Sequence, residues 1–237
     1  MAACIAAGGK CSRLRIMTVN PTAPAEIDRL RDCVLLLGGK TEEAVSRAVR
    51  ALTTRDSELA TSVCEADRLI DQMELQIDQL SVEILAKQKL EPHDLRMVVS
   101  VAKITPILER IADHAASIAE AAIALNNEPE IDNYFDFSQM AGIASGMLRE
   151  ALDAFTAENS DASRRIIARD AELDSRYARV YDQLLRRMGE RPTESSGAAK
   201  LLFVAKHFER IGDYVKDICE LNVYLTEAVF IKHSQPA

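Results

Sequence analysis

The chain has 237 residues, of which 48% are hydrophobic and 28% are charged, and this balance excludes an intrinsically disordered protein. Aromatic residues make up only 5% and Trp is absent, whereas strand-rich folds need more aromatic and turn residues. A formal net charge of −8 argues against a nucleic-acid partner. The composition therefore predicts an all-α protein.

The N-terminal residues differ from the rest of the chain. They contain Lys10, Arg13 and Arg15 but no acidic residue, and the apolar stretch around Ile5 precedes these charges, the reverse of a secretory signal. We expect residues 1–24 to form a disordered tail, or the natural protein to start at Met17. A targeting segment is the alternative.

Helix breakers divide the remainder into six long segments. The breaks fall at Pro21/Pro24, Arg55–Ser57, Glu91-Pro92, Asn126–Pro129, Asn159-Ser160 and Arg191-Pro192. Each segment is rich in Ala, Leu, Glu and Arg, which lose little conformational freedom in a helix. No apolar run approaches the roughly 18–20 residues of a membrane-spanning helix.

Three features stand out along the first three segments. Gly38-Gly39 lies inside the first, where close helix packing or a kink would explain it. The second and third carry apolar stripes at alternating steps of three and four, which suit long helices packed in a bundle. The stripes are Leu59, Val63, Ala66, Ile70, Met73, Ile77, Leu80 and Ile84, then Ile104, Leu108, Ile111, Ala115, Ile118, Ala122 and Leu125. Pro106 should kink or loosen the third helix.

The last three segments repeat the first three. A shift of 103 residues aligns Gly39 with Gly142, Thr53 with Thr156 and Asp67 with Asp170, and a shift of 100 aligns Glu109-Arg110-Ile111 with Glu209-Arg210-Ile211. The sequence therefore predicts two tandem antiparallel three-helix bundles related by internal duplication. We expect the bundles at residues 25–128 and 138–232, with a linker at 129–137.

Each half contains two acidic pairs with i, i+4 spacing. They are Asp67/Asp71 and Glu109/Asp113 in the first half, and Asp170/Asp174 and Glu209/Asp213 in the second. In an antiparallel hairpin that turns at Glu91-Pro92 or at Arg191-Pro192, the two pairs of each half stand level on neighbouring helices. We therefore expect four carboxylates to converge in each half.

Converging carboxylates suit hard cations such as Fe(III), Mn, Mg, Ca or Zn. Glu120, Asp217 and Glu220 extend the acidic stripe and would either ligate further ions or be solvated. The alternative for the pairs themselves is simple solvation, because Glu109 and Asp113 fall on the outer side of their helix, and Arg110 and Arg210 would neutralise part of the charge. If a metal binds, its site is a surface cluster.

Other site chemistries find little support. The Glu-x-x-His motif of di-iron bundle enzymes is absent, as are GxxxxGK[ST], GxGxxG and GxSxG motifs. The five cysteines are scattered without a CxxC pair, which indicates reduced cytosolic thiols; they are Cys4, Cys11, Cys33, Cys64 and Cys219. No catalytic residue is predicted.

Two segments resemble a known signature. Leu108-Glu-Arg-Ile-Ala-Asp-His114 and Phe208-Glu-Arg-Ile-Gly-Asp-Tyr214 are similar to the duplicated motif of the PhoU family. Leu37-Gly-Gly39, Glu65-Ala-Asp67 and Asp94-Leu-Arg-Met97 extend the resemblance to nearly the whole chain. Ala112 replaces the glycine usual in the signature.

The resemblance implies a cytoplasmic protein peripheral to the inner membrane. It would act as a negative regulator of phosphate uptake and phosphate-starvation signalling, an adaptor between the phosphate ABC transporter's ATPase subunit and the phosphate-sensing histidine kinase. A homodimer is expected, with no catalysis. The resemblance also implies a multinuclear cluster of iron or zinc, with Mn or Mg as alternatives, at the eight acidic positions Asp67, Asp71, Glu109, Asp113, Asp170, Asp174, Glu209 and Asp213. A carboxylate-bridged metal enzyme and a metal-free helical scaffold are the competing hypotheses.

Overall fold

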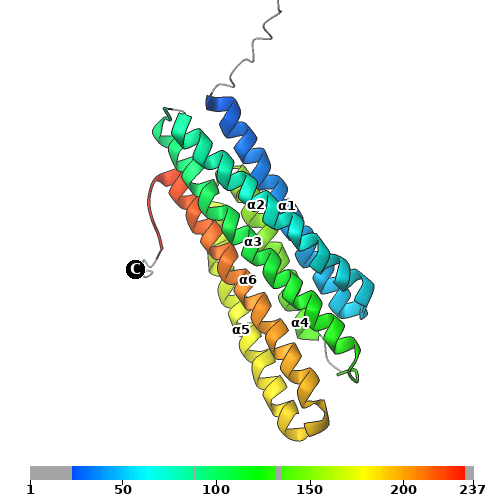
Figure 1. The fold of residues 1–237 in the computed structure, drawn as a ribbon. Coiled ribbons are helices and arrows are strands. Elements are labelled where there is room, and N and C mark those ends of the chain that lie inside the picture. Colours follow the sequence, from blue (N-terminus) through cyan, green and yellow to red (C-terminus); the bar gives the residue numbers. More distant parts are fainter. Residues whose placement is uncertain (1–22, 88, 132–134, 233–237) are drawn as a thin grey trace, which may run out of the picture.

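The computed structural model describes residues 23–87, 89–131 and 135–232. In this part of the chain six long helices and no strand are present, and the helices run roughly along one long axis (Figure 1). They are α1 (Ala23–Thr54), α2 (Ser57–Lys87), α3 (Pro92–Asn126), α4 (Phe135–Thr156), α5 (Ser160–Glu190) and α6 (Ser195–Glu227), with a short 3-10 helix, η1 (Pro192–Glu194), before α6. The predicted all-α fold of two tandem three-helix bundles is confirmed.

The boundaries differ in detail from the predicted ones. Ala23 and Pro24 belong to α1, and α4 begins at Phe135, inside the segment predicted as a linker. α6 ends at Glu227, before the predicted end of the second bundle. The remainder of the predicted tail, including Met17, lies outside the described residues.

The duplication is visible in how the helices end and begin. α1 and α4 are followed by Arg55 and Glu158, which both have left-handed backbone conformations, with φ of 54° and 48°. The next residue in each half caps the following helix: Asp56 Oδ1 accepts a hydrogen bond from the Leu59 N–H, and Asn159 Oδ1 accepts one from the Ala162 N–H, both at 2.9 Å. Equivalent local chemistry therefore produces the same turn twice.

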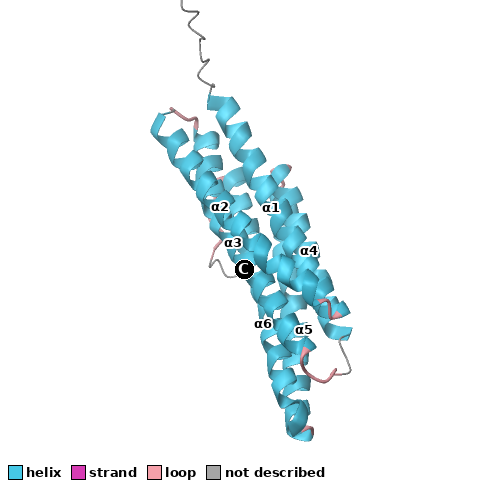
Figure 2. Ribbon diagram, turned by 45° about the vertical axis from the view of Figure 1, so that its right-hand side comes forward, coloured by secondary structure: helices cyan, strands magenta, loops and turns pink. Residues whose placement is uncertain are grey.

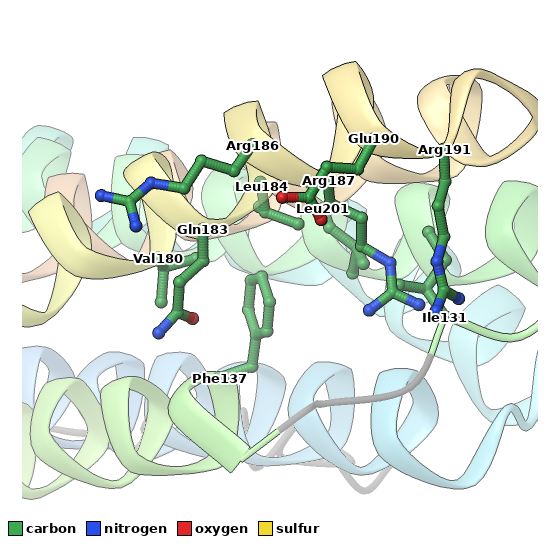
Figure 3. A pocket seen from close by; sticks show the side chains of 10 residues that line it. All are labelled: Ile131, Phe137, Val180, Gln183, Leu184, Arg186, Arg187, Glu190, Arg191 and Leu201. Carbon is green, nitrogen blue, oxygen red and sulfur yellow. The ribbon is translucent and has the colours of Figure 1, made fainter.

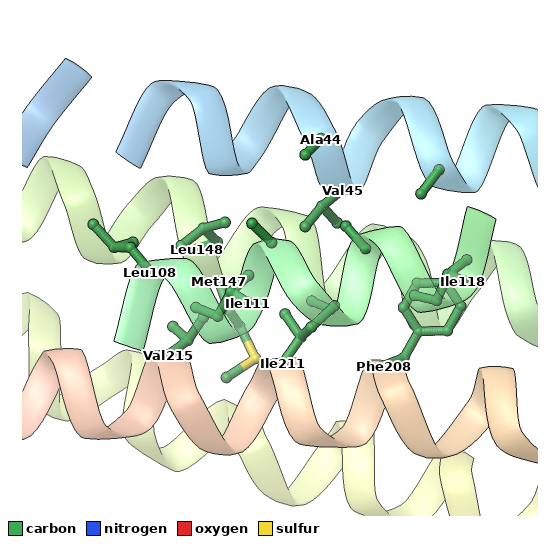
Figure 4. Close-up of a cluster of buried hydrophobic side chains, with 14 of the residues drawn as sticks. Ala44, Val45, Leu108, Ile111, Ile118, Met147, Leu148, Phe208, Ile211 and Val215 are labelled. Carbon is green, nitrogen blue, oxygen red and sulfur yellow. The ribbon is translucent and has the colours of Figure 1, made fainter. Parts of the chain in front are cut away.

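A single apolar core runs through both bundles. Every member of the predicted α3 stripe from Ile104 to Leu125 is buried. Figure 4 shows side chains of α3 and α6 meeting at the centre, with contributions from α1 and α4. Its labelled residues are Ala44, Val45, Leu108, Ile111, Ile118, Met147, Leu148, Phe208, Ile211 and Val215. α3 continues through Pro106 as one helix.

The two bundles meet where α3 packs beside α6 and α1 beside α4 (Figure 2). α3 and α6 are antiparallel, because Arg96 Nε near the start of α3 donates to the Leu225 carbonyl near the end of α6, at 3.0 Å. Gly38 explains the close approach of α1 to α4, since a Cβ there would lie 2.6 Å from Leu152 Cδ2. Close packing thus accounts for this glycine of the Gly38-Gly39 pair.

Candidate functional site

The first carboxylate cluster consists of Asp67 and Asp71 on α2 and Glu109 and Asp113 on α3. The i, i+4 spacing puts each pair on one face of its helix, and the antiparallel packing of α2 against α3 brings the two faces together. Asp67 and Glu109 are half-buried, whereas Asp71 and Asp113 are exposed. The cluster therefore lies at the surface with its inner members partly shielded from water.

Burial and the closeness of several negative charges raise pKa values in the first cluster. Burial raises the pKa of Asp67 to about 6, and the negative charges of Asp113, Asp71 and Glu120 add to the shift. Burial also raises the pKa of Glu109 to about 7, with further contributions from Asp113, Glu74, Asp71 and Asp67. Asp71 and Asp113 thus lie close enough to Asp67 and Glu109 to disfavour the ionisation of both.

Few cations balance the first cluster. Within the described residues no Lys or Arg forms an ion pair within 4.0 Å of these four carboxylates. Arg110 acts from farther away and offsets part of the rise in the pKa of Asp113, which burial and Asp71 cause. No group of three or more Asp, Glu, His or Cys in the described part of the chain is already arranged to hold a metal ion. Metal binding here stays a prediction.

The second carboxylate cluster consists of Asp170 and Asp174 on α5 and Glu209 and Asp213 on α6. Asp170 is only 4% exposed, whereas Asp174 is exposed. Burial raises the pKa of Asp174, followed by the charge of Asp170, while Lys216 lowers it. The predicted residues are again neighbours, but this cluster lies deeper than the first.

Three cations accompany the second cluster. Lys216 donates to Asp170 Oδ2 and, at 3.2 Å, to Asp213 Oδ1. Lys206 Nζ lies 2.6 Å from Glu209 Oε2, and Arg210 Nη1 lies 3.4 Å from Asp213 Oδ2. The sequence pattern predicts Arg210 as a neutralising group but neither of the two lysines. The missed signal is their spacing, three residues before Glu209 and three after Asp213 on the same helix.

Gly212 explains the depth of Asp170. A Cβ at this position would lie 3.0 Å from Asp170 Oδ1 and 2.5 Å from Leu173 Cδ2, so only glycine lets α5 come this close. The corresponding residue in the first half is Ala112, which is buried. Ala112 carries a methyl group where Gly212 has none, and Asp67, the counterpart of Asp170, remains half-exposed.

A histidine pair lies between the clusters, where α3 meets α6. The Nδ1 atoms of His114 and His207 are 2.9 Å apart, and the ring of Tyr214 stacks on His114 with centroids 5.5 Å apart. Burial, His207 and Arg210 together lower the pKa of His114 to about 4. The pair therefore joins the bundles as neutral imidazoles, one donating and one accepting. Sequence reasoning missed it because it depends on how the two bundles pack.

A cavity of about 360 Å³ lies between the start of α4 and the end of α5 (Figure 3). Phe137 points across it toward α5. Arg187 and Arg191 line one side, and both pair with Glu194 of η1. The lining contains none of the predicted carboxylates, and two of its arginines serve to hold the turn before α6.

A family model for the PhoU domain matches residues 34–122 and 137–221, one match in each bundle. The chain belongs to the PhoU family. The match includes the first cluster in one domain and the second cluster in the other. The resemblance drawn from the two Glu-Arg-Ile-x-Asp segments is therefore confirmed.

Curated relatives cover most of the PhoU-family chain. A phosphate-specific transport system accessory protein PhoU homolog of Pseudomonas putida is 36% identical over 210 residues, which are 88% of this chain and 82% of the relative. The phosphate-specific transport system accessory protein PhoU of Escherichia coli K12 is 32% identical over 209 residues, or 88% of this chain and 87% of the relative.

Solved PhoU structures share the fold. PhoU from Pseudomonas aeruginosa superposes with a TM-score of 0.86 at 35% identity, covering 88% of this chain and 100% of that one. The phosphate transport system regulatory protein PhoU from Streptococcus pneumoniae gives a TM-score of 0.82 at 27% identity, with 89% and 100% coverage. No helix in the described part of this chain combines the length and apolar character that a membrane crossing requires.

Proposed function

We propose that this chain is an accessory regulatory protein of a phosphate-specific transport system. The observation that carries this proposal is the family match in both halves, together with curated relatives that bear that description over nearly the same length. The protein would restrain phosphate uptake and phosphate-starvation signalling at the cytoplasmic periphery of the inner membrane. It would do so as an adaptor between the transporter's ATPase subunit and the phosphate-sensing histidine kinase, without catalysing a reaction.

We propose the two carboxylate clusters as the surfaces through which this adaptor binds its partners. They lie where α2 packs against α3 and α5 against α6, and paired helices are a common docking surface for a partner helix. Charged groups on such a surface contribute mainly to recognition and to the rate of association. A homodimer is part of the proposal, and light scattering coupled to gel filtration would measure it.

Metal binding is proposed at the first cluster, whose chemistry fits it. Its ligand atoms would be carboxylate oxygens, and no Lys or Arg among the described residues forms an ion pair with them. Iron or zinc, or else Mn or Mg, would be held by Asp67, Asp71, Glu109 and Asp113. A bound cation would supply the positive charge that relieves the repulsion among these residues.

Charge reversal at exposed, equivalent positions tests the adaptor role. Asp71 and Asp174 correspond under the duplication and are both exposed, so Asp71→Lys and Asp174→Lys should fold. Asp182→Lys, on an exposed part of α5 away from the acidic pairs, is the matched control. We expect pull-down of the transporter's ATPase subunit and of the sensor kinase to weaken for the two cluster variants only. Binding that is unchanged in all three would contradict the clusters as contact surfaces, and no capture by the wild-type chain would contradict the adaptor role.

A further inference from the structure

The two carboxylate clusters are not equivalent, although duplication made them from one pattern. In the second, the Lys216 ammonium lies between the helices and donates to Asp170 Oδ2 on α5 and Asp213 Oδ1 on α6. Its side chain is 32% exposed and that of Asp170 only 6%. Lys216 therefore contacts a carboxylate on each of the two helices whose acidic residues were predicted to hold a metal ion.

The first half has no counterpart of this cation. The shift of 100 residues that aligns Glu109 with Glu209 places Ala116 at Lys216 and Pro106 at Lys206. The second cluster thus sets three cations, Lys206, Arg210 and Lys216, against four carboxylates. In the first cluster, no Lys or Arg among the described residues lies within ion-pair distance of a carboxylate.

We infer that the ammonium group of Lys216 occupies the second carboxylate cluster in place of a metal ion, so that any metal this chain takes up is held by the first cluster. The inference rests on the metal-binding part of the proposed function. A cation entering the second cluster would have to displace Lys216 and break two charge-assisted hydrogen bonds, which are among the stronger polar contacts in proteins. Without that displacement it would lie beside a like charge.

A metal ion could not bind through the other oxygen of Asp170 while Lys216 stays in place. Asp170 Oδ1 is buried and has no hydrogen-bond partner. It faces the backbone of α6, where even a Cβ on Gly212 would lie only 3.0 Å away. A metal with its full set of oxygen ligands needs more room than this. The accessible oxygen, Oδ2, is the one that Lys216 already binds.

Metal loading of matched variants tests the inference. Purified full-length chains without a His tag are dialysed against Mn²⁺ or Zn²⁺, and bound metal is measured by elemental analysis. We expect Glu109→Gln/Asp113→Asn to abolish the loading of the wild-type chain and Asp174→Asn/Glu209→Gln to leave it unchanged. Lys216→Ala, which restores the first-half residue, should roughly double the loading, as expected if an equivalent oxygen site is opened. Adding Asp174→Asn/Glu209→Gln to Lys216→Ala should remove the gain.

Three further variants keep the test decisive. Lys216→Arg retains the cation and should stay at the wild-type loading, and Lys200→Ala removes another α6 lysine, which pairs with Glu128 outside the cluster. Lys216→Gln serves if circular dichroism shows that Lys216→Ala does not fold.

The possible outcomes separate the inference from the proposal beneath it. If Asp174→Asn/Glu209→Gln binds less metal than the wild-type chain, the inference is overturned, while metal binding by the protein still stands. An empty wild-type chain with a loaded Lys216→Ala supports the inference and contradicts the first-cluster site. No gain in either Lys216→Ala or Lys216→Gln overturns the inference.

Discussion

Gly212→Ala should destabilise the protein, although alanine favours helices more than glycine does. The added Cβ would lie 2.5 Å from Leu173 Cδ2 and 3.0 Å from Asp170 Oδ1. Leu173 is fully buried and Asp170 nearly so, which leaves neither side chain an easy way to move. Overpacking of this kind costs typically 1–3 kcal/mol, and the close double contact favours the upper end, about 3 kcal/mol. The gain in helix propensity is about 1 kcal/mol, so the net loss is about 2 kcal/mol.

Urea unfolding followed by circular dichroism measures this loss. With a urea dependence of about 2 kcal/mol per molar, the midpoint should fall by about 1 M. Gly39→Ala is the matched control, because Gly39 is exposed inside α1 and a Cβ there meets nothing within 4 Å. It should raise stability by about 0.5–1 kcal/mol. A Gly212→Ala chain as stable as the wild type, beside a stabilised Gly39→Ala, would refute the argument that Gly212 lets α5 approach α6.

Three further predictions concern titration and buried polar contacts. In metal-free protein the raised pKa of Glu109, about 7, means that the folded state binds this proton more readily than the unfolded state, so stability should rise as the pH falls from 8 through 7. Glu109→Gln should remove that rise in thermal melts, and an unchanged pH dependence would contradict the assignment. The pKa of His114, lowered to about 4 by burial, His207 and Arg210, predicts that NMR detects a neutral ring at pH 5.5, whereas a protonated ring would refute it. Asn222 is buried and donates to the Ala154 carbonyl at 2.9 Å, so Asn222→Leu should cost about 1–3 kcal/mol in urea unfolding, and a neutral effect would show that the carbonyl finds another donor.

The sequence by itself determined the helices and their turns. Apolar periodicity is local information, and the stripe from Ile104 to Leu125 identified the buried face of α3 without reference to any other helix. Pro92 and Asn159 marked helix starts for equally local reasons. The duplication then predicted which carboxylates would face one another, because the register of an antiparallel hairpin follows from the position of its turn.

Only the tertiary structure decided how the two carboxylate clusters differ. Lys216 bonds to a carboxylate 46 residues away, and which partner a long side chain reaches depends on the distance between packed helices. That distance is set in turn by Gly212, whose missing Cβ matters only once α5 lies against it. The contact of His114 with His207 likewise exists only because the bundles pack through α3 and α6. Periodicity specifies the buried face of a helix, whereas the separation and stagger of two packed faces depend on residues far apart in the chain.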